Sequence, residues 1–202
     1  SAAKIMPLSC DASVLENYSL VVNEGKILAL IPTEQALKNY PAKEHVKLDD
    51  HVLMPGLINA HGHSAMSLLR GYADDLPLMQ WLEKYIWPAE QTWVSEEFVA
   101  DGSRLAIAEM IASGTTCFSD MYFFPEVTAA LAASLGMRCQ LSFPIFDFPC
   151  NWGSGADDYL KQGRDLAQHY KSNPYIHVIP GPHAPYTVND ENLIKAKQFA
   201  SD

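Results

Sequence analysis

From residue 52 onward, apolar stretches of strand length alternate with longer stretches of helical character, and this alternation constrains the fold more than any other feature. Strands are expected at residues 52–60, 115–121, 138–145 and 175–179. Helices are expected at residues 96–113, 125–135, 157–171 and from about residue 190 onward. Strands that are separated by helices pair in parallel, so the sequence predicts an α/β fold built on a parallel sheet.

The ends of the expected helices carry residues that suit those positions. Gly114 and Gly136 each follow a helix, where a residue without a side chain adopts the left-handed conformation that ends a helix. Asn189 and Asp190 precede the last helix, where a side-chain oxygen can accept a hydrogen bond from a free backbone N–H.

Residues 1–52 differ from the rest of the chain and are expected to form a small β unit. Two strands, at residues 18–23 and 26–31, flank Glu24 and Gly25, which together signal a hairpin turn. A unit with only a few strands buries little apolar surface by itself. This unit is therefore expected to pack against other structure.

The number of strand–helix units falls short of a closed barrel. A (β/α)8 barrel takes roughly 250 residues, whereas residues 53–202 hold four such units. The chain is therefore either a fragment that contains the first half of a barrel or a four-stranded open α/β domain with helices on both faces. We favour the fragment, because residue 202 falls inside the last expected helix.

The first expected strand leads into two histidines that are one residue apart, His61 and His63. If the strand continues through them, both side chains point the same way and can bind one cation, with Gly62 leaving the space between them clear. Such a pair also occurs by chance. Its position at the end of an apolar strand favours a divalent metal site.

Other titratable side chains follow the expected strands, at the edge where parallel barrels carry their chemistry. They are Asp120 and Tyr122, then Asp147, then His183. Asp120 either orients a metal ligand or caps the next turn. His183 lies between Pro182 and Pro185, and it either caps a loop or donates a hydrogen bond to a substrate near the metal.

Residues 76–90 form an aromatic-rich stretch that contains Trp81 and Trp87. Either these indoles clamp a hydrophobic surface of the barrel or they contact a ligand. For both side chains, packing explains the pattern at least as well as ligand contact.

The charge of the chain argues against a nucleic-acid partner. The chain has 14 basic and 24 acidic residues, whereas a nucleic-acid site needs clustered lysine and arginine.

The cysteines form no Cys-x-x-Cys pair, which fits reduced thiols better than a disulfide framework. No apolar run approaches the roughly 18 residues of a membrane span, and the first residues lack a signal-peptide core. We expect a cytoplasmic protein with no nucleic-acid or membrane partner.

Two other zinc-enzyme patterns are absent from the sequence. Deaminases with His-x-Glu and Pro-Cys-x-x-Cys are excluded, because Pro149 and Cys150 are followed by residues 151–153 without a second cysteine. The metallopeptidase pattern His-Glu-x-x-His does not occur either.

Taken in order, the motifs resemble the amidohydrolase superfamily, and within it the 5-methylthioadenosine and S-adenosylhomocysteine deaminases, which are related to triazine chlorohydrolases. The resemblance covers nearly the whole sequence. It rests on four segments: MPGLINAHGH at residues 54–63, SLLRGYADDLPLMQWL at 67–82, GTTCFSDMY at 114–122 and GPHAPY at 181–186.

The resemblance implies the fold and the site residues. It implies the first half of a (β/α)8 barrel, preceded at residues 1–52 by the N-terminal part of a composite β-sandwich. His61 and His63 would bind a single metal ion, normally zinc, while Glu90 would bind the ribose diol and His183 the base. Further metal ligands and the catalytic acid–base group would lie beyond Asp202.

The resemblance also implies hydrolytic removal of the C6 amino group of adenine, with zinc activating the water and ammonia leaving. A small purine nucleoside is therefore the expected substrate, and a homo-oligomer the expected assembly. Some members carry arginines that pair with the carboxylate of S-adenosylhomocysteine, but residues 142–149 here contain an acid and no base. This favours methylthioadenosine, whose methylthio tail suits a pocket lined by phenylalanines such as Phe143.

Two alternatives stay open at this stage. Within the same chemistry, the substrate could be another amino- or halo-substituted heterocycle, such as a triazine, guanine or a cytosine-like base; Glu90 argues against these, because they offer no diol. Outside enzymes, the chain could be an inactive half-barrel that binds metal weakly through two histidines.

Overall fold

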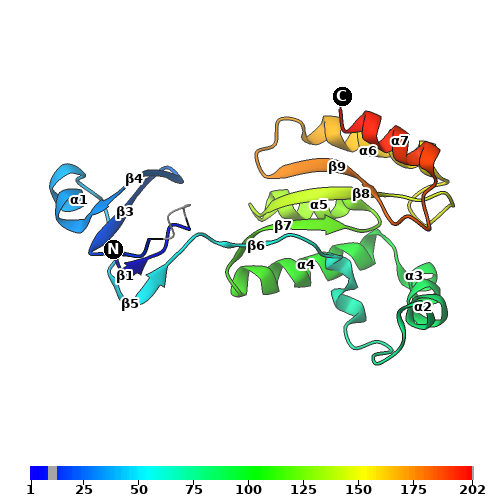
Figure 1. The fold of residues 1–202 in the computed structure, drawn as a ribbon, viewed down its shortest axis with the longest axis horizontal. Helices are drawn as coiled ribbons and strands as arrows, with labels where there is room; N and C mark the ends of the chain where they lie inside the picture. Colours follow the sequence, from blue (N-terminus) through cyan, green and yellow to red (C-terminus); the bar gives the residue numbers. More distant parts are fainter. Residues whose placement is uncertain (9–12, 202) are drawn as a thin grey trace. The chain divides into compact units, whose positions relative to one another are not determined.

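The computed structural model describes residues 1–8 and 13–201, and its contacts divide the chain into two compact units, Ser1–Gly56 and Leu57–Asp202 (Figure 1). Cys10 lies outside the described residues, and the other three cysteines, Cys117, Cys139 and Cys150, are free thiols. Within the described ranges, no helix combines the length and apolar character needed to cross a bilayer.

The first unit is a small β structure, as expected. Strand β1 (Ala2–Ile5) lies between β2 (Leu15–Glu16), which is antiparallel to it, and β5 (Leu48–Leu53), which is parallel to it. The predicted hairpin is confirmed, since β3 (Tyr18–Asn23) and β4 (Lys26–Pro32) pair in antiparallel fashion on either side of its turn. Helix α1 (Thr33–Asn39) follows this hairpin.

The strand predicted at residues 52–60 is wrong, because the structure divides this apolar stretch between the two units. Val52 and Leu53 end β5 and pair with β1, whereas β6 (Leu57–Asn59) begins the sheet of the second unit. Pro55 lies in the interruption, and its ring removes the N–H that a continuous strand would need. Apolar character alone does not reveal such a break.

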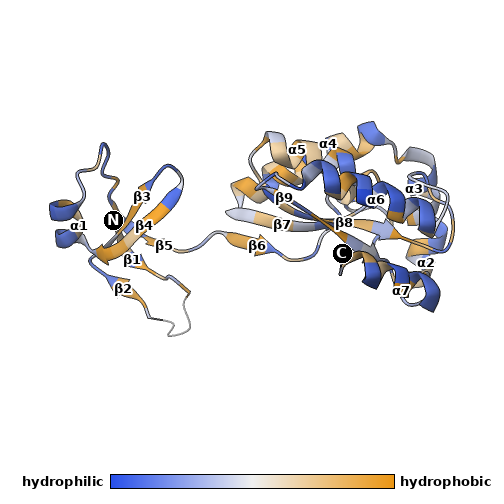
Figure 2. Ribbon diagram, turned by 90° about the horizontal axis from the view of Figure 1, so that it is seen from above, coloured by the Kyte–Doolittle hydropathy of each residue, from blue (hydrophilic) through white to orange (hydrophobic). Residues whose placement is uncertain are grey.

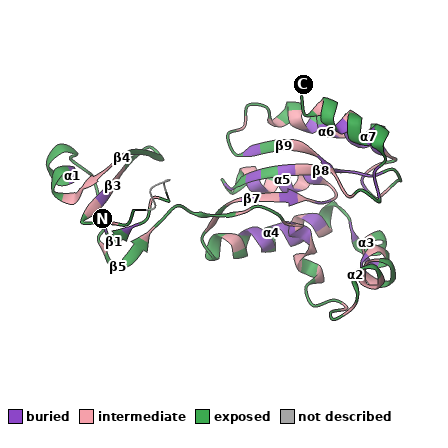
Figure 3. Cartoon of the chain, viewed as in Figure 1, coloured by how far each residue is buried: buried purple, intermediate pink, exposed green. Residues whose placement is uncertain are grey.

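The second unit contains a four-stranded parallel sheet in the order β6-β7-β8-β9. Strands β7 (Thr115–Met121) and β8 (Arg138–Ile145) have the predicted bounds, and β9 (Ile176–Pro182) runs further than predicted. Burial alternates along the first six residues of β8, and its last three residues are all buried, so the strand packs against helices on one face and is covered on both faces at its end (Figure 3). The predicted α/β class is confirmed.

Four helices follow or connect these strands as predicted: α4 (Glu96–Ala112), α5 (Pro125–Ser134), α6 (Ala156–Tyr170) and α7 (Asp190–Phe199). Figure 2 shows α4, α5 and α6 along one side of the sheet. The predicted helix ends are confirmed as well. Gly114 and Gly136 have φ values of +84° and +67°, and the Asn189 side chain accepts a hydrogen bond from the N–H of Asn192.

The aromatic-rich stretch before α4 is helical, which the sequence analysis did not predict. It contains α2 (Leu78–Trp81), a π-helical turn η2 (Leu82–Ile86) and α3 (Trp87–Trp93). Pro77 and Pro88 look like helix breakers in the sequence, yet Pro77 precedes α2 and Pro88 lies in the first turn of α3, where no N–H is required.

A short 3-10 helix, η1 (Ser64–Leu69), follows the two histidines and packs tightly on α4. A Cβ atom at Gly102 of α4 would collide with the backbone of Ala65, so only glycine allows this approach. At the other end of η1, the Arg70 guanidinium binds both carboxylate oxygens of Glu109, at 2.9 and 2.6 Å. The segment after the histidines is therefore fixed against α4.

Candidate active site

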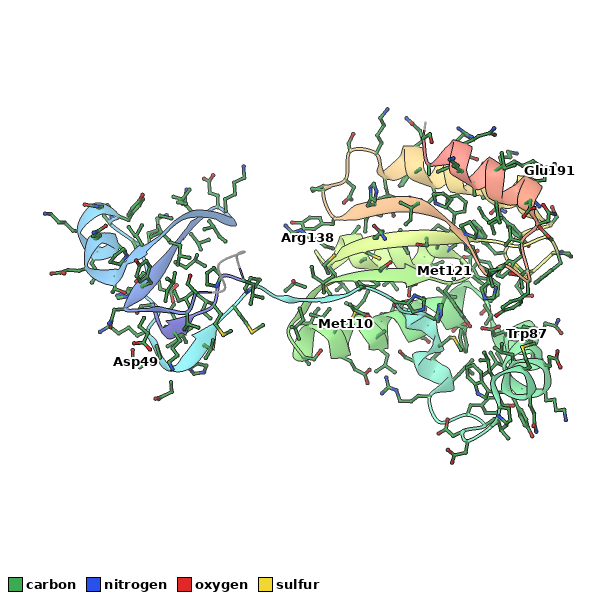
Figure 4. All side chains as sticks on the ribbon, in the orientation of Figure 1. Asp49, Trp87, Met110, Met121, Arg138 and Glu191 are labelled. Atoms are coloured by element: carbon green, nitrogen blue, oxygen red, sulfur yellow. The ribbon has the colours of Figure 1, made fainter. Side chains whose placement is uncertain are left out.

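The end of β7 holds the segment that carries the two histidines. The backbone N–H of Met121 donates to the carbonyl of Gly62 at 3.1 Å, and Nδ1 of His63 lies 2.6 Å from the carbonyl of Met121. The N–H of Ser64 donates to Asp120 Oδ1 at 2.6 Å. Figure 4 shows Met121 at the end of the sheet close to α2 and α3, far from Arg138, where β8 begins. We refer to these three hydrogen bonds as the β7 clamp.

The β7 clamp defines which nitrogen of His63 is free. A carbonyl oxygen only accepts, so Nδ1 of His63 donates to Met121 and Nε2 is the ring nitrogen left for another partner. This arrangement is typical of imidazoles that bind metals through Nε2.

His61 and His63 lie beyond the end of β6 rather than within it, because the strand stops at Asn59. Their rings nevertheless lie close together in an edge-on arrangement, with centroids 5.0 Å apart and planes at 84°. Two neutral imidazoles are suitable zinc ligands, but they supply about half of a tetrahedral set. Among the residues that the structure describes, no group of three or more histidine, cysteine or acidic side chains could hold a metal ion.

Asp120 is almost fully buried, with 2% of its surface exposed. Burial raises the pKa of its carboxyl group, while hydrogen bonds from Ser64 and electrostatic interaction with His63 and His61 lower it. The carboxylate therefore binds the backbone directly after the histidines and interacts electrostatically with both rings. A metal cation beside those rings would favour its charged form further.

A cavity of about 610 Å³ opens at the carboxyl ends of the strands in the second unit. His63, Glu90 and His183 line it together, as does Trp81. Most of the remaining lining is apolar and includes Met66, Met79, Leu82, Ile86, Trp87 and Phe146. The stretch that was predicted only as an aromatic clamp therefore forms one wall of the cavity.

Phe143 does not line this cavity, so the expectation that it belongs to the pocket is wrong. Its side chain is fully buried and contacts the rings of Trp152 and Phe199, on the helix side of β8. Because side chains alternate along a strand, the neighbouring Pro144 faces the cavity instead. Phe146, in the loop after β8, supplies the aromatic surface that the sequence analysis assigned to Phe143.

Glu90 comes from α3 and is the one carboxylate among the described residues that line the cavity. The Tyr122 hydroxyl donates to its Oε1 at 2.8 Å. Burial raises the pKa of the Glu90 carboxyl group, and the hydrogen bond from Tyr122 and electrostatic interaction with His63 oppose this rise. In turn, burial and the nearby Glu90 charge raise the pKa of Tyr122, which stays a protonated donor.

His183 lies after β9, and its backbone N–H donates to the carbonyl of Ile145 at 3.2 Å. Nδ1 is 3.0 Å from the Thr187 hydroxyl, and the ring packs against Phe146 with centroids 5.0 Å apart. Burial lowers the pKa of His183, and electrostatic interaction with His63 lowers it further. The imidazole is therefore neutral at pH 7, with Nε2 available to a ligand.

Asp147, the remaining titratable group at a strand end, has a structural role. Its carboxylate accepts hydrogen bonds from the N–H of Asn189 and from the side-chain amide of Asn192, both at 2.8 Å. It thus holds the start of α7. It does not line the cavity.

Asn151 was missed in the sequence analysis, although it also lines the cavity. Its amide nitrogen donates to the carbonyls of Glu90 and Val94, at 3.2 and 3.0 Å, and so holds the C-terminal turn of α3. No local pattern identifies such a residue, because its partners are about 60 positions away and in an unpredicted helix.

Comparison with known protein families and sequences agrees with the predicted resemblance. The model of the amidohydrolase family matches residues 52–202. A 5-methylthioadenosine/S-adenosylhomocysteine deaminase of Saccharophagus degradans is 52% identical over 202 residues, which are 100% of this chain and 45% of that protein. A 5'-deoxyadenosine deaminase of Methanosarcina mazei is 41% identical over 201 residues, covering 98% of this chain and 45% of that protein. The chain thus spans about half the length of the curated relatives it matches.

Solved structures with the same fold support this comparison. An adenosine deaminase from Xanthomonas campestris with bound zinc matches with a TM-score of 0.96 at 44% identity, over 99% of this chain and 46% of that chain. A zinc complex of atrazine chlorohydrolase from Arthrobacter aurescens TC1 matches with a TM-score of 0.85 at 17% identity, over 100% and 49% of the two chains. At that identity the second match shows the fold alone.

Asp120→Asn tests whether the carboxylate supports the two histidines. The amide oxygen can still accept from Ser64, but the negative charge beside the imidazoles is lost. We expect zinc affinity of the full-length protein, measured with a competing chelator, to fall by about 10- to 100-fold.

Asp147→Asn is the matched control, because it changes the same group at the end of the next strand, away from the cavity. Its zinc affinity should equal that of the wild type. If the Asp120→Asn variant bound zinc as tightly as the wild type, the Asp120 carboxylate would have no part in metal binding.

Proposed function

We propose that this chain, which belongs to the amidohydrolase family, supports zinc-dependent hydrolytic deamination of an adenine nucleoside. The observation that carries the proposal is that His63, Glu90 and His183 line one cavity, with the ring of His61 beside that of His63. The names of the curated relatives and of the Xanthomonas campestris enzyme support the same reaction.

His61 and His63 are the proposed metal ligands in this chain. The free Nε2 of His63 and the buried carboxylate of Asp120 nearby fit a site for a divalent cation. When bound, zinc supplies Lewis acidity that brings the pKa of a water molecule to about 7. We assign the remaining ligands and the proton-transferring carboxylate to residues outside 1–202, because the relatives are about twice as long.

Glu90 and His183 are the proposed substrate-binding residues. A vicinal diol donates two hydrogen bonds, and a carboxylate has two oxygens to accept them, which suits Glu90 to a ribose. His183 is neutral and held in place by Thr187, so it can form a hydrogen bond with a purine base without placing a second positive charge beside the metal. Apolar walls would then exclude water from the base and sugar.

We further propose that methylthioadenosine is preferred over S-adenosylhomocysteine. None of the described residues that line the cavity is a lysine or an arginine, so the amino-acid carboxylate would lose its hydration without a cationic partner. Met66, Met79 and Phe148 offer apolar contacts to a methylthio group instead.

Three expectations from the sequence stay predictions within this proposal. They are a role for residues 1–52 in a composite β-sandwich, a homo-oligomeric state and a cytoplasmic location.

Ammonia release by the full-length protein tests the reaction. We expect release from an adenine nucleoside, its loss after dialysis against a chelator and its return when zinc is added. His63→Ala should abolish activity, whereas Asp147→Asn should retain it. Ammonia release from a triazine or guanine, but not from adenine nucleosides, would contradict the proposal in favour of another heterocycle. Absence of all such activity in a zinc-loaded protein would contradict it in favour of a non-enzymatic metal binder.

The relative kcat/KM values for methylthioadenosine and S-adenosylhomocysteine test the proposed preference. An unpaired carboxylate in an apolar site should lower kcat/KM for S-adenosylhomocysteine by about tenfold or more. Substitution of Phe148, which lines the cavity and is partly exposed, by arginine should narrow that difference. Equal or better turnover of S-adenosylhomocysteine by the wild type would overturn the preference while leaving the deaminase assignment intact.

A further inference from the structure

The orientation of Glu90 is controlled from two other elements of the fold. Its carboxylate binds the Tyr122 hydroxyl directly after β7, and its backbone carbonyl binds Asn151 in the loop after β8. The terminal torsion of a glutamate is broad, so the helix that carries Glu90 does not by itself fix the carboxylate plane. Only a partner at the oxygen atoms can do so.

Tyr122 is well suited to be that partner. Its side chain is 6% exposed, and its ring packs edge-on against Phe123 with centroids 5.0 Å apart. The residue before it, Met121, takes part in the β7 clamp on His63. One short segment therefore places both the metal-binding histidine and the donor to Glu90.

The hydrogen bond from Tyr122 leaves acceptor sites of Glu90 free. An ionised carboxylate has about four lone-pair sites on its two oxygens, and Tyr122 occupies one of them on Oε1. Oε2 and the remaining site of Oε1 lie on a carboxylate whose plane is fixed. Such a group accepts hydrogen bonds from two donors at a set spacing, and a cis vicinal diol provides that spacing. It binds a single hydroxyl group less tightly than a diol.

We infer that Tyr122 is a positioning residue that orients the Glu90 carboxylate toward a vicinal diol, so that selectivity for ribose over 2′-deoxyribose depends on the Tyr122–Glu90 pair. This inference rests on the proposed function. It adds a residue that does not contact the reacting atoms and assigns it an effect on sugar selectivity rather than on the chemical step.

The test compares wild type and Tyr122→Phe, in the zinc-loaded full-length protein, with methylthioadenosine and its 2′-deoxy analogue. Loss of a hydrogen bond to a charged group corresponds to about tenfold or more in binding. We expect KM for the ribonucleoside to rise by about tenfold while kcat stays within about twofold. For the 2′-deoxy analogue, which cannot use both acceptor sites, KM should hardly change.

Two further variants separate positioning from general damage to the fold. Tyr85→Phe is the matched control, because Tyr85 is in the adjacent π-helical turn, packs edge-on against Tyr72 and does not line the cavity. It should leave both KM values unchanged. Glu90→Gln should lose the same selectivity, and adding Tyr122→Phe to it should cause no further loss, since the two residues act through one contact.

The outcomes are distinct. If Tyr122→Phe impairs the ribonucleoside and its 2′-deoxy analogue equally, or leaves the selectivity unchanged, the inference is wrong and the proposed function stands. If the wild type releases no ammonia from either nucleoside, the proposed function is wrong and the inference is overturned with it. A fall in selectivity that is confined to KM, and absent in the Tyr85 variant, supports the inference.

Discussion

The hydrogen bond from His63 Nδ1 to the Met121 carbonyl is the interaction on which the candidate site depends. β6 is only three residues long and ends before the histidines, so the strand itself cannot orient them. Instead, the end of the adjacent strand binds the backbone of Gly62, the ring of His63 and the N–H of Ser64. The geometry of the proposed metal site therefore depends on the pairing between two strands.

The same strand end connects the histidines to the rest of the cavity. Tyr122 follows Met121 and binds Glu90, which comes from a helix that covers the carboxyl ends of the strands. The Asp120 carboxylate is buried and the Glu90 carboxylate is partly buried, and each is held by a specific donor. In surroundings of low dielectric such contacts are stronger than in water, and so is the penalty for losing them. An apolar cavity with few polar groups at defined positions is typical of a small-molecule site.

The sequence predicted the regular part of the fold well, because that part depends on local patterns. Apolar periodicity gave β7 and β8 with their observed bounds, and Gly114 and Asn189 gave helix ends. The apolar stretch at residues 52–60 was assigned to one strand, because hydropathy does not distinguish two short strands of different sheets from one long strand. The helices at residues 78–93 were missed because prolines at helix starts look the same as helix breakers.

The site residues also fall into two groups, those that the sequence identified and those that required the tertiary structure. His63, Glu90 and His183 were recognised from motifs and are brought to one cavity by the parallel strands and the helices above them. Phe143 was misplaced, since the choice of face depends on the register of β8, which composition does not reveal. The contacts of Asn151 and Tyr122 with Glu90 join distant parts of the chain, so they require the tertiary structure.

The position of a bound zinc ion is the most direct test of the proposed site. A crystal structure of the zinc-loaded full-length protein, with anomalous diffraction recorded at the zinc edge, measures this without reference to activity. We predict one zinc peak bound by Nε2 of both His61 and His63 at about 2.0–2.1 Å, with Nδ1 of His63 still bound to the Met121 carbonyl. A zinc peak that lies elsewhere, or a His63 ring turned so that Nε2 faces Met121, would contradict the account.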